Sequence, residues 1–62
     1  MRNYTNSEII ESIHELIHSE RDRAILKRRL VDGITYEKLA EEFDLSVAQI
    51  KRIVYKCENI IF

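Results

Sequence analysis

The stretch Thr35–Lys56 constrains the fold of this chain most, because its residue pattern encodes two short helices and the turn between them. It reads TYEKLAEEFDLSVAQIKRIVYK. Leu39 and Phe43 are four residues apart, so they stack on one side of the first helix. Asp44 stands where the turn needs a left-handed residue, a conformation that Asp tolerates better than most residues other than glycine. The pattern predicts a helix-turn-helix.

The second helix of this motif has two different faces. Ser46 followed by Gln49 forms a capping box, which marks the start of the helix. One face is apolar and comprises Ile50, Ile53, Val54, Cys57, Ile60 and Ile61. The other comprises Ala48, Gln49, Lys51, Arg52, Tyr55, Lys56 and Asn59. A solvated surface would explain the lysines, but Tyr55 among three cations and a glutamine is a mixture suited to phosphates and base edges.

Length and composition favour a single domain over residues 1–62. A domain of this size buries only about 60 % of its unfolded surface, so it depends on good local signals. No stretch approaches the roughly 20 apolar residues of a membrane span, and the N-terminal MRNYTNSE lacks the apolar core of a signal peptide. With a single cysteine, we expect a cytoplasmic protein with Cys57 reduced and no membrane partner.

The distribution of charge is more informative than the net charge of −1. The net charge alternates as −3, +3, −3 and +2 over residues 1–20, 21–33, 34–45 and 46–62. The basic blocks therefore coincide with the second and fourth predicted helices. Lys27 and Arg28 are predicted to point outward, either as a solvated helix end or as phosphate contacts. The aliphatic stem of Arg29 is predicted to lie among core residues, with its guanidinium reaching a carboxylate or the surface. Any non-specific affinity for DNA should be weak and salt-dependent.

A first helix is predicted over residues 6–18. Thr5 with Glu8 forms a capping box at its start. Its apolar stripe comprises Ile9, Ile10, Ile13, Leu16 and Ile17. His14 and His18 are four apart, but two ligands do not make a metal site and no third ligand is fixed nearby by spacing. The sequence predicts no metal or other cofactor.

A second helix is predicted over residues 20–32. Ser19 with Asp22 starts it, and Gly33 ends it as the residue expected after a helix C-terminus. Its core-facing residues are Ile25, Leu26 and Leu30.

The remaining helices are predicted over residues 36–43 and 47–60, which makes the chain an all-α, small four-helix domain with a C-terminal helix-turn-helix. Thr35 is the expected N-cap of the third helix. Free amide groups at a helix N-terminus suit a phosphate, so Thr35, Tyr36 and Lys38 are second-rank DNA contacts. Packing against the second helix is the alternative role for Tyr36.

The C-terminal residues Ile60, Ile61 and Phe62 prolong the apolar face of the last helix. They either close over the first helix or stay exposed. An exposed apolar end marks a partner surface, so homodimerisation or docking on a larger protein is a second hypothesis for this chain.

From about Ser19 to Lys56 the sequence resembles the fourth conserved region of bacterial sigma factors, most closely the extracytoplasmic-function group. The matching run is RDRAILKRRLVDGITYEKLAEEFDLSVAQIKRIVY. It combines an arginine-rich helix, the step DGITYEKLA and an LS pair before the last helix. The sequence departs from the family where Asp44 replaces a common glycine, where Val47 replaces a polar residue, and in its apolar C-terminus.

The resemblance implies a four-helix domain whose last helix enters the major groove of a promoter element and whose helices can touch RNA polymerase. By position, it implies recognition-helix contacts at Gln49, Lys51, Arg52, Tyr55 and Lys56, with Ser46 and Ala48 beside the groove. The other conserved regions of such factors have no counterpart in these 62 residues, so we expect a stand-alone regulator of bacterial or phage origin or an excised domain. A diverged domain that has kept the fold and lost promoter reading is a further alternative.

The function predicted from the sequence is therefore double-stranded DNA binding with transcriptional regulation. The alternative is a protein-interaction module that docks on RNA polymerase or self-associates through its apolar C-terminal end. An enzyme is not expected, because no nucleophile or carboxylate pair stands beside a base at useful spacing.

Overall fold

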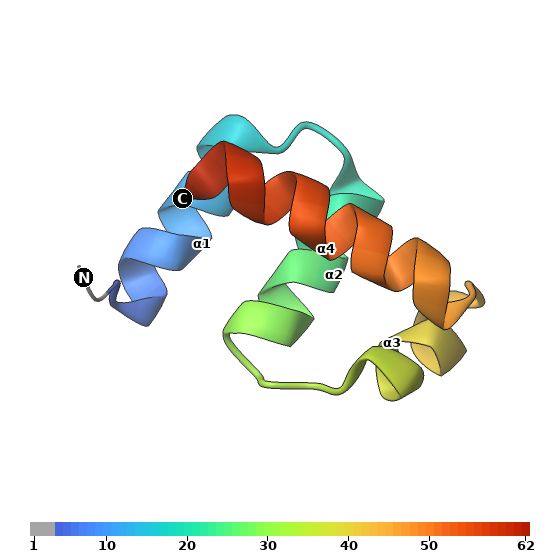
Figure 1. Cartoon of the computed structure of the whole chain (residues 1–62). Helices are drawn as coiled ribbons and strands as arrows, with labels where there is room; N and C mark the ends of the chain where they lie inside the picture. The colour runs from blue at the N-terminus through green and yellow to red at the C-terminus, as the bar shows by residue number, and fades with distance from the viewer. Residues whose placement is uncertain (1–3) are drawn as a thin grey trace.

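The computed structural model describes residues 4–62 and contains four helices and no strand within them. The helices are α1 (Asn6–Leu16), α2 (Glu20–Leu30), α3 (Tyr36–Phe43) and α4 (Val47–Ile61). The longest helix, α4, packs against each of the other three and crosses in front of α2 in Figure 1. The end of α4 lies beside α1, and its beginning lies beside α3. This is the all-α, four-helix fold predicted from the sequence.

Each helix begins at a serine or threonine that accepts a hydrogen bond from a backbone N–H three residues later. These N-caps are Thr5, Ser19, Thr35 and Ser46. At α1 and α4 the side chain of the third helical residue, Glu8 or Gln49, accepts a hydrogen bond from the backbone N–H of the cap and completes a capping box. The helix starts predicted from local sequence are therefore confirmed.

The C-terminal ends of the first two helices differ from the prediction. α1 stops at Leu16, two residues before the predicted residue 18. The cause is Arg23 of α2, whose guanidinium donates to the backbone carbonyl of His14 at 2.8 Å and to that of Ile17. These bonds satisfy carbonyls that the helix leaves open at its end, so the chain turns toward α2 instead of continuing. Leu16, the last residue of α1, belongs to the predicted apolar stripe but is 43 % exposed.

α2 stops at Leu30, again two residues before the predicted end. Gly33 adopts the left-handed conformation with φ 70° that its predicted position requires. The reversal brings the N–H of Ile34 to the carbonyl oxygen of Arg28 at 3.1 Å, which closes the end of the helix. Residues after Leu30 therefore form the turn and not a further half-turn of helix.

The core is built from all four helices and the turn after α1. Its members are Ile13, Ile17, Ile25, Leu26, Leu39, Ile50, Val54 and Cys57, each at most 4 % exposed. Ile50, Val54 and Cys57 come from the predicted apolar face of α4, so the opposite face is directed away from the core. Core packing thus fixes which side of α4 is available to a partner.

Candidate nucleic-acid interface

The turn between α3 and α4 sets the angle at which α4 leaves the core. Asp44 adopts the predicted left-handed conformation, with φ 55° and ψ 46°. Its N–H bonds the carbonyl of Glu41 at 3.4 Å, and the N–H of Leu45 bonds that of Ala40 at 3.0 Å. Two backbone bonds around one left-handed residue make a tight, defined helix end. The helix-turn-helix is therefore rigid at its centre.

The outward face of α4 is free of the protein's own core. Its exposed residues are Ala48, Gln49, Lys51, Arg52, Tyr55 and Lys56, with Ser46 exposed at the cap. Tyr55 is 51 % exposed although it is a large aromatic residue. Within residues 4–62, no hydrogen bond or ion pair engages the guanidinium of Arg52. The five donors of that guanidinium remain available to an acceptor outside the protein.

Gln49 is exposed but its side-chain carbonyl is already in use. Oε1 accepts the N–H of Ser46 at 2.9 Å, and the N–H of Gln49 donates to Oγ of Ser46 at 3.1 Å. An amide reads adenine by donating and accepting at once. Gln49 can do this only by using the second lone pair of Oε1 or by releasing the cap. The structure thus assigns this residue a capping role that its exposure alone would not reveal.

Tyr36 lies at the junction of α2, α3 and α4. The Cζ atom of Arg29 is 4.2 Å from the ring centroid, and Nζ of Lys51 is 5.8 Å from it. The ring of Tyr55 meets the ring of Tyr36 edge to face, with centroids 6.4 Å apart and an interplanar angle of 83°. Tyr36 is only partly exposed and packs against the core. Its packing role is therefore observed, whereas its predicted DNA contact is untested.

Thr35 and Lys38 occupy the start of α3. The hydroxyl of Thr35 accepts the N–H of Lys38 at 3.2 Å, which confirms the predicted cap. Both side chains are exposed. They lie at the end of α3 that also holds Tyr36, so the second-rank residues share one corner of the molecule with Lys51 and Tyr55.

Arg28 is held within the protein. Its Nη2 lies 2.6 Å and its Nε 3.2 Å from the two carboxylate oxygens of Glu42, and Nη1 lies 3.1 Å from Oδ2 of Asp32. These hydrogen bonds raise the pKa of Arg28 and lower the pKa of Glu42. A phosphate contact by Arg28 would have to break this fork, so the structure favours the bridge between α2 and α3.

Arg29 differs from its prediction in what it reaches. Its Nη1 donates to the backbone carbonyl of Ile34 at 3.0 Å, and its guanidinium lies over Tyr36, so its partners are a carbonyl and an aromatic ring and not a carboxylate, while the residue stays partly exposed. Sequence reasoning also missed Arg23, which caps α1 from the next helix. Both arginines act on the backbone carbonyls of neighbouring segments, which no local spacing could show.

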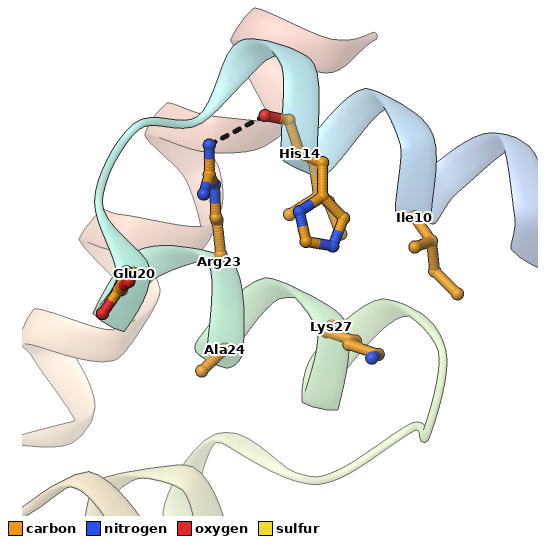
Figure 2. A pocket seen from close by; sticks show the side chains of 7 residues that line it. Ile10, His14, Glu20, Arg23, Ala24 and Lys27 are labelled. Atoms are coloured by element: carbon orange, nitrogen blue, oxygen red, sulfur yellow. Dashed lines mark hydrogen bonds between the residues drawn. The ribbon is translucent and has the colours of Figure 1, made fainter.

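A cavity of about 280 Å³ lies between α1 and α2, on neither α3 nor α4. Its lining residues are Ile10, Ile13, His14, Glu20, Arg23, Ala24 and Lys27. Figure 2 shows the side chains from the two helices facing one another, with Arg23 bonded to the carbonyl of His14. Apolar residues with a charged rim suit a partner side chain. This concavity is separate from the outward face of α4.

His14 and His18 do not share one helix. Because α1 ends at Leu16, His18 lies outside it, so their four-residue spacing does not place them on one helical face. Over residues 4–62, no three side chains of the His, Cys, Asp or Glu type gather as metal ligands would. In the same part of the chain, no helix has the length and apolar character needed to span a bilayer.

The helix-turn-helix and the arginine-rich helix before it coincide with a known protein family. Residues 19–57 match the family described as Sigma-70, region 4. The chain belongs to the sigma-70 region 4 family. The match runs from the N-cap of α2 to Cys57 in the core, so it includes every residue predicted to contact DNA. No curated protein and no solved structure matches the chain.

Membership of the sigma-70 region 4 family places this chain among DNA-binding domains. Region 4 domains are DNA-binding helix-turn-helix domains of transcription regulators, and they also bind the RNA polymerase core. They are regulatory domains with no known enzymatic role. The assignment to the extracytoplasmic-function group stays a prediction from sequence.

Proposed function

We propose that this chain binds double-stranded DNA in a sequence-specific manner, with the N-terminal half of α4 in the major groove. We further propose that the 62 residues suffice for this as a stand-alone regulator. The proposal rests on the orientation of α4. Its polar and basic face is exposed, and its apolar face is buried in the core. A tight turn and a capping box hold that face in one orientation.

Arg52 is the proposed reader of a base. It is exposed, unpaired within residues 4–62 and one helical turn after Gln49, so the two side chains point in similar directions. The planar fork of an arginine matches the two acceptors that guanine presents in the major groove. Gln49 is the proposed partner for an adenine, with the restriction that its carbonyl also serves the cap of α4.

The remaining predicted residues are proposed to position the domain on the DNA. Those on α4 or at its cap are Ser46, Ala48, Lys51, Tyr55 and Lys56, and those at the start of α3 are Thr35 and Lys38, on either side of Tyr36 in the sequence. Contacts to phosphate and sugar fix register without reading sequence. Because the whole chain has a net charge of −1, these few cations must supply most of the attraction, and binding should weaken steeply as salt rises.

The proposal is tested by selecting bound duplexes from a random pool at low salt with the 62-residue chain. Replacement of Arg52 by alanine should weaken binding to the selected duplex by about 1–3 kcal/mol and relax the preference at one base position. Arg21→Ala is the matched control, because Arg21 is an exposed arginine at the start of α2, is paired with Asp22 and is not among the residues proposed to contact DNA. A wild-type chain that enriches no duplex, or an Arg52→Ala variant that binds like the control, contradicts the proposal.

The cavity between α1 and α2 supports a second proposal, in which RNA polymerase docks there. Region 4 domains bind the polymerase core, and the apolar residues Ile10, Ile13 and Ala24 form a concave surface that the proposed DNA face does not use. Ala24 is exposed, so Ala24→Arg should fill the opening while the fold is retained. We expect that variant to lose polymerase binding and keep DNA binding. Unchanged polymerase binding contradicts this docking site.

Self-association through the C-terminal end stays a separate proposal. Ile61 packs against the core, and the ring of Phe62 stacks on that of Tyr4 with centroids 4.9 Å apart. Even so, Ile60 is 48 % and Phe62 55 % exposed. Removal of residues 60–62 should abolish any dimer seen by sedimentation at micromolar concentration. If the wild-type chain sediments as a monomer, this interface does not exist.

A further inference from the structure

We infer that Tyr36 is a positioning residue for the recognition face and not itself a DNA contact, and that Arg29 acts through it. This inference rests on the proposed DNA-binding function. It concerns one group of side chains from three helices: Arg29 on α2, Tyr36 on α3, and Lys51 and Tyr55 on α4.

The first step is that Arg29 is fixed in place. Its Nη1 donates to the carbonyl of Ile34 at 3.0 Å, and its guanidinium lies 4.2 Å from the centroid of the Tyr36 ring. The left-handed Gly33 returns the chain over the end of α2 and so brings Ile34 within reach of Arg29. The arginine is therefore held at a backbone carbonyl and at an aromatic face simultaneously.

The second step is that the backbone of Tyr36 is also fixed. Tyr36 is the first residue of α3, and the cap at Thr35 sets the direction in which that helix starts. The ring packs against the core and against the guanidinium of Arg29. A stacked guanidinium and an aromatic ring attract each other more strongly when partly removed from water. The ring thus forms a rigid surface beside α4.

The third step is that this surface contacts two outward residues of α4. Lys51 and Tyr55 are four residues apart and lie on the same side of that helix. The Lys51 ammonium lies 5.8 Å from the Tyr36 centroid, and the Tyr55 ring meets the Tyr36 ring edge to face at 6.4 Å. Both distances are within the range of favourable cation–π and aromatic contacts. One ring therefore restricts two long side chains on the same outward face as Arg52.

The consequence is preorganisation of the face that meets DNA. A flexible lysine or an unsupported tyrosine loses rotamer freedom when it binds, and that loss weakens binding. Contacts to Tyr36 remove part of this cost before DNA arrives. Tyr55 is exposed and presents its outer side to the solvent, whereas Tyr36 is partly covered and has its ring engaged. The geometry therefore assigns support to Tyr36 and contact to Tyr55.

The test compares two substitutions of Tyr36 on the duplex that the wild-type chain selects. Tyr36→Phe keeps the ring and should bind within about twofold of wild type. Tyr36→Leu removes the ring and should bind about three- to tenfold more weakly, as expected for the loss of one or two aromatic contacts. Arg29→Gln should weaken binding in the same direction. If Tyr36→Phe loses as much affinity as Tyr36→Leu, the hydroxyl contacts DNA and the inference is wrong.

A double-substitution cycle separates support from a general loss of stability. If Tyr36 acts through Tyr55, the combined variant Tyr36→Leu, Tyr55→Leu should bind less weakly than the sum of the two single losses predicts. Arg28→Gln is the control, because it breaks the bridge between α2 and α3 without touching Tyr36. At equal folded fraction, this control should bind DNA like wild type. Additive losses at Tyr36 and Tyr55 contradict the inference.

A measurement without DNA distinguishes this inference from the proposed function. The Tyr55 ring protons of the free protein should move toward their unfolded-chain shifts in Tyr36→Leu and stay in place in Tyr36→Phe. Tyr36→Phe and Arg29→Gln still decide the question if Tyr36→Leu does not fold. If the wild-type chain selects no duplex, the proposed function fails. If the wild-type chain selects a duplex, but the variants have wild-type DNA affinity and wild-type Tyr55 chemical shifts, only the inference fails.

Discussion

The Arg28 guanidinium lies 2.6 Å from a carboxylate oxygen of Glu42 and thereby joins α2 to α3 across fourteen residues of chain. The same guanidinium donates to Asp32 at the end of its own helix. These pairs are at the surface, where a single ion pair contributes little to stability. The pairs join the surfaces of the two helices, while the buried residues Ile25, Leu26 and Leu39 pack α2 and α3 into the common core.

The bridge makes part of the stability pH-dependent. The Arg28 hydrogen bonds lower the pKa of Glu42 in the folded protein below its ordinary value of 4.5. The unfolded state then binds more protons near that pH, so the contribution is full above it and is lost as pH falls toward the lowered pKa. Urea unfolding from about pH 7 to pH 3 should therefore show a smaller loss of stability for Glu42→Gln than for wild type. Parallel pH profiles would contradict the bridge.

Gln49 has a capping role and a proposed role in DNA binding, and one substitution should change DNA binding while stability is retained. Gln49→Glu keeps an acceptor for the N–H of Ser46 and is the residue commonly found at this position of a capping box. The variant should unfold within about 0.5 kcal/mol of wild type. It cannot donate to a base and adds a negative charge to the proposed DNA face, so binding to the selected duplex should fall at least tenfold. Equal DNA binding would remove Gln49 from the interface.

Gly33 provides a test of the turn that leads into α3. It has φ 70°, and a methyl group built on it would meet no other atom within 4 Å. Gly33→Ala should therefore cost about 1–2 kcal/mol through backbone strain alone. Gly33→Asn should cost less, because asparagine tolerates this conformation. Thermal unfolding of both variants checks the order, and an alanine variant as stable as wild type would contradict the left-handed turn.

Cys57 reports on the integrity of the core. It is 1 % exposed, and burial is the main cause that raises the pKa of its thiol, with Asp22 adding to the effect. Because the thiolate is the reactive form, alkylation in native buffer should be slow and should accelerate strongly in denaturant. Cys57→Ala should abolish the reaction. Rapid alkylation of the native chain would show that the end of α4 is not packed as described.

The sequence was sufficient to predict where the helices start, because each N-cap involves residues only three positions apart. The sequence predicts Thr35 and Ser46 as N-caps, Ser46 with its partner Gln49, and the left-handed conformation of Asp44, and the structure confirms all three. These are local interactions, and local patterns encode them. The apolar face of α4 followed from helical periodicity for the same reason, with Ile50 and Val54 fully buried.

The remaining features depend on groups far apart in the chain. The early end of α1 depends on Arg23, which bonds a carbonyl nine residues away, and the role of Arg28 depends on Glu42 in the next helix. Its place at the start of the third helix predicts that Tyr36 either contacts DNA or packs against the second helix. Only the positions of Arg29 and Tyr55 around its ring show the packing. Long side chains find such partners in three dimensions, so their spacing along the sequence leaves the outcome open.

The central claim is that the outward face of α4 meets the DNA, and amide chemical-shift mapping with the selected duplex tests it most directly. We expect the largest changes at Gln49, Lys51, Arg52 and Tyr55, smaller ones at the start of α3, and almost none around the cavity between α1 and α2. Shifts concentrated at Ile10, Ala24 and Lys27, with the outward face of α4 unmoved, would contradict the account.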